Sequence, residues 1–205
     1  MRLDKVIVRA ILSTLAAMLA LFAFMILALT FIYPSTMMEI TYNLGMDGAS
    51  LRCAARAYDY TDNVYYIAYA TEVAIGAEDY AEIVECGSKL IHDDEERFQA
   101  YCEVRNATLP DGATGTYEQY VYGQVCAAKY RLGEKQAAVE EAFGYLEPST
   151  FPQNNPAAAV LLVALEQEGK SGETVAMIKE KMNGIANISD EDKAYFDGIF
   201  ALLNG

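Results

Sequence analysis

Residues 10–33 read AILSTLAAMLALFAFMILALTFIY, which is 24 residues without a charged side chain. A helix of about 20 apolar residues crosses a hydrocarbon core of about 30 Å, so this stretch can span a bilayer with some tilt. A cleavable signal peptide has a shorter apolar core, roughly 7 to 15 residues, followed by small residues at the cleavage site. Residues 27–33 offer no good small-x-small site. We therefore predict a retained transmembrane anchor at residues 10–33, with a removed signal peptide as the alternative.

The charges before this stretch predict its orientation. Arg2, Lys5 and Arg9 precede the span, against the single acid Asp4. Basic residues stay on the cytoplasmic side of a membrane helix. We expect residues 1–9 to be cytoplasmic and residues 34–205 to form a domain outside the cytoplasm, so that the protein crosses the cytoplasmic membrane once.

The charge of the chain is divided unevenly between these parts. Residues 1–33 carry a net charge of +2, whereas residues 34–205 carry −16. A strongly acidic domain repels nucleic acid and anionic headgroups and favours basic partners. Nucleic acid is therefore excluded as a partner. The 172 residues after the span are enough for one compact domain or a short helical array.

The pattern of apolar residues after the span predicts an all-α fold. In the segment from Asn63, the side chains Val64, Ile67, Thr71 and Ile75 recur at intervals of three and four. No segment shows the alternation of β-branched residues that is typical of a strand. Helices are expected at residues 35–44, 47–60, 63–76, 79–91, 94–108, 116–132, 134–146, 156–168, 171–185 and 190–203.

Acidic runs mark two of the expected helix starts. Residues 93–96 read DDEE, and residues 189–192 read SDED, which is close to a capping box. Side-chain oxygens there can accept from the amides of the first turn, and the negative charge suits the positive end of the helix dipole. A calcium loop is the alternative for residues 93–96, but it needs alternating oxygen ligands and a central glycine.

One segment resembles a known repeat. Residues 130–142, YRLGEKQAAVEEA, are similar to the turn and second helix of a tetratricopeptide repeat, in which a glycine ends the first helix and a small residue five positions later packs in the second. Gly133 and Ala138 take these places, and Tyr122, Val125 and Cys126 fall where the family has a large, an aliphatic and a small residue. The resemblance implies an irregular array of helical hairpins, since the glycines at 45, 76, 133 and 169 do not keep the 34-residue period.

Chemistry-bearing motifs are absent from the sequence. The chain has one histidine, His92, no Cys-x-x-Cys pair and no phosphate, dinucleotide or hydrolase fingerprint. We expect no enzyme activity, no cofactor and no metal. Of the four cysteines, Cys86 and Cys102 flank the turn at residues 92–94, so a bridge between them is the alternative to four buried thiols.

Tyrosine is the more suggestive residue type, with 15 copies and no tryptophan. A tyrosine ring suits both helix packing and recognition surfaces. Packing is the simpler interpretation for most of them. The functional interpretation places rings and carboxylates in a groove of the array, where they hold an extended basic peptide. The candidate partner-binding residues are Tyr65, Tyr66, Tyr69, Tyr117, Tyr120 and Tyr122.

Taken with the anchor, these features predict a membrane-tethered protein-protein interaction module that assists secretion or envelope assembly through a basic or membrane-embedded protein partner. Two alternatives stay open: a sensor of a small ligand or cell-wall fragment, and an accessory subunit of a larger membrane complex. Met37, Met38 and Met46, just after the span, are either an adaptable contact surface or gap-filling side chains of the first hairpin.

Overall fold

The fold is all-α, as the sequence predicts. The computed structural model describes residues 2–110, 115–145, 155–185 and 190–202, and in these ranges it contains eleven helices and no strand. All ten helices expected after the span are present, with ends that differ from the prediction by two residues or fewer. The described chain divides into two compact units, residues 1–66 and 67–205.

The first unit begins with a long apolar helix, α1 (Arg2–Ile32). Its stretch Lys5–Ile32 has 28 residues and a mean hydropathy of 2.7 in its most apolar part. The rest of the chain buries no residue of this part. This helix is long and apolar enough to cross a membrane, but a signal sequence near the N-terminus has the same length and composition. It extends well before the predicted span and ends just short of Tyr33, after which α2 begins.

A helical hairpin follows α1 in the same unit. Helix α2 (Pro34–Asn43) starts with a proline, which suits the first helical turn because the missing amide is not needed there. It pairs with α3 (Asp47–Thr61), and its side chains Met37 and Met38 are buried. The exposed Met46 lies in the turn. Met37 and Met38 are therefore gap-filling residues, as the simpler interpretation holds.

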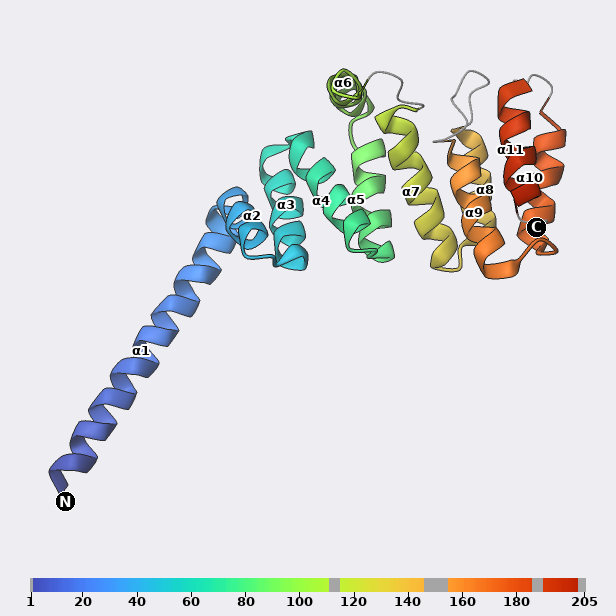
Figure 1. Cartoon of the computed structure of the whole chain (residues 1–205). Coiled ribbons are helices and arrows are strands. Elements are labelled where there is room, and N and C mark those ends of the chain that lie inside the picture. Colours follow the sequence, from blue (N-terminus) through green and yellow to red (C-terminus); the bar gives the residue numbers. More distant parts are fainter. Residues whose placement is uncertain (1, 111–114, 146–154, 186–189, 203–205) are drawn as a thin grey trace. The chain divides into compact units, whose positions relative to one another are not determined.

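The second unit holds the remaining helices and opens within α4 (Val64–Gly76). Helix α7 (Tyr117–Arg131) packs against α5 (Tyr80–His92), α8 (Lys135–Gly144) and α9 (Pro156–Glu168). Helix α9 also packs against α10 (Glu173–Asn183), and α11 (Asp190–Leu202) completes the series of neighbouring helices (Figure 1). The core of these helices is apolar and includes the buried side chains Tyr130, Val139, Leu161, Val175 and Ile178.

Helix α6 (Glu95–Asn106) breaks the sequence of pairs. In Figure 1 it is seen nearly end-on, whereas α5 and α7 run along the plane of the view. Its buried side chains Phe98 and Cys102 hold it against the unit. Asp94 caps its first turn by accepting from the Arg97 amide at 3.0 Å, which confirms the capping interpretation of residues 93–96. The predicted cap at Ser189 lies outside the described residues.

All four cysteines are buried thiols, so the alternative bridge between Cys86 and Cys102 is not formed. Burial raises the pKa of Cys102 and that of Cys126 to about 12. A thiol with such a pKa stays protonated at neutral pH and is a poor nucleophile. The cysteines therefore act here as small packing residues.

Candidate functional site

The six candidate tyrosines are divided between the two units. Tyr65 and Tyr66 lie in the first unit, with ring centroids 5.6 Å apart. The other four belong to the second unit, where Tyr69 is half-buried in α4. Tyr117 and Tyr120 line the same cleft.

This cleft, which we call the Glu72 cleft, has a volume of about 420 Å³. Its walls come from α4, α6 and α7 and from the segments that flank α6 and α7. The lining residues are Glu72, Arg105, Leu109, Gly115, Thr116, Tyr117 and Tyr120. The cleft therefore joins a carboxylate, a guanidinium and two aromatic rings within the second unit.

The Glu72 carboxylate is held by two donors. Its Oε1 accepts from the Arg105 Nη2 at 2.9 Å and from the Tyr117 hydroxyl at 2.9 Å. The Arg105 guanidinium also lies over the Tyr117 ring, 5.1 Å from its centroid. Burial, followed by the charge of Glu72, raises the pKa of Tyr117, which keeps this phenol protonated as a donor. The result is a preorganised carboxylate in the lining of the cleft.

Local sequence fixes the position of Tyr117. Thr116 and Gln119 form a reciprocal capping box at the start of α7. The Tyr117 amide donates to Asn106 Oδ1 at 2.7 Å, which ties α7 to the end of α6. The Tyr101 ring meets Tyr117 edge-on at 5.7 Å. Tyr117 is therefore a structural wall of the cleft rather than an accessible contact residue.

Tyr120 is the accessible aromatic side chain of the cleft. It is 36% exposed, and its ring lies 6.3 Å from that of Tyr117. Desolvation, with a smaller contribution from Glu72, raises the pKa of Tyr120. A carboxylate beside aromatic faces binds cations, and Arg105 is an example of such a cation supplied by the chain itself. Arg105 already takes this place at Glu72, so the lining carries one base against one acid, and the exposed face of Tyr120 is what stays open to a lysine or arginine side chain of a partner.

Tyr122 lies apart from the Glu72 cleft and packs between helices. Its ring stacks on Tyr145, with centroids 4.0 Å apart and planes 5° apart, and it also contacts Phe98. The Tyr145 hydroxyl lies 3.2 Å from His92 Nε2 and donates to Glu141 at 3.3 Å. These contacts favour the packing interpretation for Tyr122, and they give the exposed His92 a partner that sequence reasoning missed.

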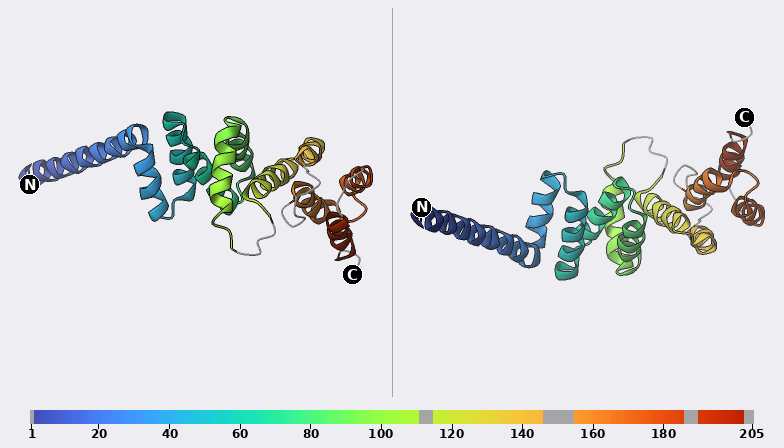
Figure 2. Two further views of the ribbon diagram at one scale, coloured as in Figure 1. Left: turned by 90° about the horizontal axis from the view of Figure 1, so that it is seen from above. Right: turned by 90° about the horizontal axis from the view of Figure 1, so that it is seen from below.

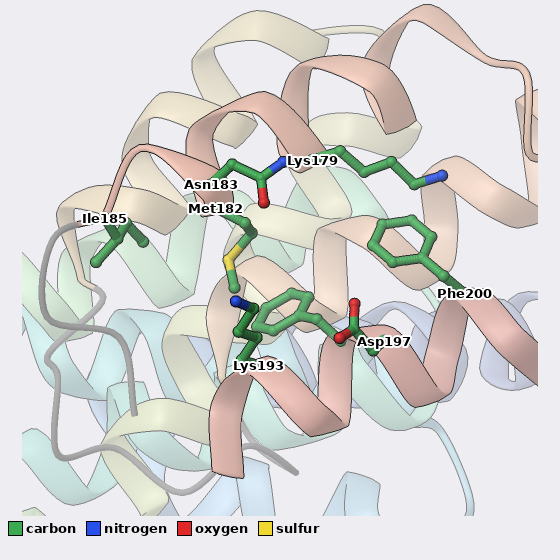
Figure 3. Close-up of a pocket in the computed structure, with 8 residues that line it drawn as sticks. Lys179, Met182, Asn183, Ile185, Lys193, Asp197 and Phe200 are labelled. Carbon is green, nitrogen blue, oxygen red and sulfur yellow. The ribbon is translucent and has the colours of Figure 1, made fainter. Parts of the chain in front are cut away.

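A second cleft, of about 330 Å³, lies between α10 and α11 (Figure 3). Its apolar lining is Met182, Ile185, Phe196 and Phe200, and its polar lining is Lys179, Asn183, Lys193 and Asp197. The Lys179 ammonium lies over the Phe200 ring, 4.2 Å from its centroid. Two lysines against one acid make this lining basic within an acidic domain. This cleft cannot be predicted from the sequence, because lysines on two successive helices look like ordinary surface charges.

Glu168 is the centre of a hydrogen-bond network that the sequence does not predict. This carboxylate accepts from the Tyr130 hydroxyl at 2.6 Å, from the Thr174 amide at 3.1 Å and from Lys135. Gly172 begins α10 without a side chain that can cap it, so Glu168 caps α10 from the end of α9. Lys135 and Tyr130, the two largest causes, lower the pKa of Glu168 from 4.5 to about 2.

This shift predicts an acid-dependent loss of stability. Because the pKa of Glu168 is lower in the folded state, its contribution is complete above pH 4.5 and is lost as the pH falls towards about 2. We expect Glu168→Gln to lower the melting temperature at neutral pH, and we expect the curves of variant and wild type to converge near pH 2. Thermal melts followed by circular dichroism across this range measure the effect. Glu166→Gln, at a carboxylate that is 63% exposed, is the control and should leave the acid dependence intact. Parallel curves for Glu168→Gln and wild type would contradict the assignment.

Comparisons of the chain with protein-family models, with curated proteins and with solved structures gave no match. The fold and the two clefts therefore define a class only: an all-α protein of eleven described helices, with a long apolar N-terminal helix and neighbouring helix pairs.

Proposed function

We propose that this protein is a membrane-tethered interaction module that binds a basic segment of a partner protein through the Glu72 cleft. The observation that carries the proposal is the cleft itself, in which a preorganised carboxylate lies beside the accessible ring of Tyr120. The function is recognition rather than catalysis, because the cleft offers a charge and aromatic faces but no nucleophile with an adjacent base.

The membrane tether is the second part of the proposal. Helix α1 stays in the cytoplasmic membrane, residues 1–9 face the cytoplasm, and the acidic domain lies outside. The length and apolar composition of Lys5–Ile32 support this arrangement, as do the basic residues at its start. Tethering keeps the domain near the membrane, where it meets exported or membrane-embedded partners.

The pairing of α7 to α10 supports a tetratricopeptide-like architecture for the second unit. Gly133 ends the α7 hairpin turn with a φ of +95°, and Ala138, five residues later, is fully buried. Helix α9 packs on both α7 and α8, and α10 packs on α9 and α8. Consecutive hairpins arranged in this way present an extended surface to peptides. The turn after α4 departs from the pattern, because Glu78 rather than Gly76 has the positive φ.

The charge of the domain determines how the partner arrives. A net charge of −16 on residues 34–205 attracts a basic segment and accelerates its association, and added salt weakens this attraction. Charge alone gives little specificity. The Tyr120 ring and the fixed geometry at Glu72 supply the short-range part of the recognition.

The test is capture of the full-length protein from membranes in mild detergent, followed by affinity measurement with the captured partner. Glu72→Gln and Tyr120→Ala should each weaken binding by more than about 1 kcal/mol, which is about fivefold, because both groups contact the partner. The melting temperature should change little for Tyr120→Ala. Glu85→Gln and Tyr60→Ala, at exposed positions outside the cleft, are the matched controls and should bind as wild type does. Wild-type affinity in both cleft variants would reject the Glu72 cleft as the binding site.

A second candidate function, a sensor of small ligands, is favoured by the cleft between α10 and α11 (Figure 3). Its apolar floor and the ammonium groups of Lys179 and Lys193 suit a small anion with an apolar body. Purification of the full-length protein with its bound molecules distinguishes the candidate functions. A soluble exported partner supports the interaction module, a stoichiometric membrane complex supports an accessory subunit, and a ligand-induced melting shift without a partner supports the sensor.

A further inference from the structure

The hairpin of α2 and α3 exposes apolar side chains directly after the apolar helix. Tyr42 is 57% exposed, Leu44 is 68% exposed and Met46 is 51% exposed, and all three lie at the end of α2 or in the turn that follows it. Tyr33, between α1 and α2, is 58% exposed. Exposed apolar side chains that cluster in one short segment usually mark a surface that a membrane or another molecule covers.

Two contacts hold this hairpin against the end of α1. The Arg56 guanidinium of α3 lies over the Phe31 ring, 4.2 Å from its centroid. The Nη1 atom of the same guanidinium donates to the Thr30 carbonyl oxygen at 3.4 Å. The last turn of α1 and the middle of α3 are therefore in direct contact, which places the hairpin beside the end of the apolar stretch.

The direction of α2 relative to α1 is equally informative. Helix α1 lies in the plane of Figure 1 while α2 is seen nearly end-on, and in both views of Figure 2 α2 runs across the line of α1. If α1 crosses a bilayer, α2 then lies along the bilayer surface. Tyrosine and long apolar side chains are favoured at this level of a membrane.

We infer that the turn between α2 and α3 rests in the interfacial layer of the membrane, with Leu44 and Met46 inserted among the headgroups. This inference rests on the proposed membrane anchor and adds a second contact with the lipid. Glu39 and Asp47 are exposed on the same hairpin, so attraction to anionic headgroups does not drive the insertion. Burial of apolar surface drives it, and neutral lipids suffice. The contact fixes the orientation of the first unit on the membrane.

The chain contains no tryptophan, which makes single tryptophans clean reporters of depth. The full-length protein is reconstituted in neutral phosphatidylcholine vesicles that carry bromine either near the headgroup or deep in the acyl chains. Leu44→Trp should lose most of its fluorescence to the shallow bromines. Leu19→Trp, within α1, should be quenched by the deep bromines, and Tyr60→Trp, near the other end of α3, should keep its fluorescence.

The three reporters separate the possible failures. If Leu44→Trp and Tyr60→Trp are both unquenched while Leu19→Trp is quenched, the anchor stands and the interfacial hairpin is wrong. If Leu19→Trp is also unquenched, the membrane tether of the proposed function fails with it. Quenching of Leu44→Trp only when anionic lipid is added would overturn the apolar mechanism.

Discussion

We expect Tyr130→Ala to lower the free energy of unfolding by about 3 to 5 kcal/mol, the range for truncation of a large buried aromatic residue. Tyr130 is fully buried in the core formed by α7 to α11, and it is the largest fully buried side chain among the described residues. Its hydroxyl reaches Glu168 of α9, which in turn binds the start of α10. The substitution therefore leaves a cavity and removes one of the donors that hold Glu168.

Denaturant unfolding of the full-length protein in mild detergent, followed by circular dichroism, measures this loss. The thiol of Cys126 belongs to the same core, so its reactivity reports local opening. Tyr130→Phe is the matched control, because it keeps the ring and removes only the hydroxyl. It should cost about 1 kcal/mol, the usual value of one hydrogen bond. Equal losses in both variants would show that the hydroxyl, and not the ring, dominates.

The second large effect is expected for Gly87→Ala, which should destabilise the protein by about 1 to 3 kcal/mol through overpacking. Gly87 of α5 lies where α5 meets α7, and a Cβ atom there would come within 2.4 Å of the Val125 Cγ2 atom. Val125 is fully buried and β-branched, so it has little freedom to move away. The α5 and α7 backbones can approach closely only because position 87 has no side chain.

A double-mutant cycle tests this explanation. Val125→Ala removes the methyl group that would clash, so Gly87→Ala should cost clearly less in a Val125→Ala background than in wild type. Gly76→Ala, at a glycine with open space around the added Cβ, is the matched control and should be nearly neutral. Additive effects of Gly87→Ala and Val125→Ala would mean that the cost arises elsewhere.

The helices could be predicted from sequence because their signals are local. Each signal lies within a few neighbouring positions: a glycine at the end of one helix, a capping side chain at the start of the next, and a period of three to four residues between them. Helices α7 and α8 pack as neighbours, with Gly133 in the left-handed conformation between them and Ala138 fully buried. Asp94 caps α6.

The site depends on contacts that no local pattern encodes. Glu72 of α4 and Tyr117 of α7 are 45 residues apart in the sequence, and only the packing of the folded chain brings them into contact. The abundance of tyrosine points to Tyr117 and Tyr120, but nothing in the sequence distinguishes Glu72 or Arg105 from the many other charged residues of an acidic chain. The sequence places Tyr122 next to them, but side chains two positions apart on a helix point to nearly opposite faces, and the half-buried Tyr122 stacks on Tyr145 instead.

Photo-crosslinking at position 120 in intact membranes shows directly whether the Glu72 cleft contacts a partner protein. A photoreactive phenylalanine analogue replaces Tyr120 in the full-length protein, and the same analogue at Leu132, an exposed residue after the end of α7, is the control. We predict one strong crosslink to a partner protein from position 120 and none from position 132, with Glu72→Gln reducing the yield. Absence of a crosslink at position 120 despite full incorporation, or equal crosslinks from both positions, would contradict recognition through the Glu72 cleft.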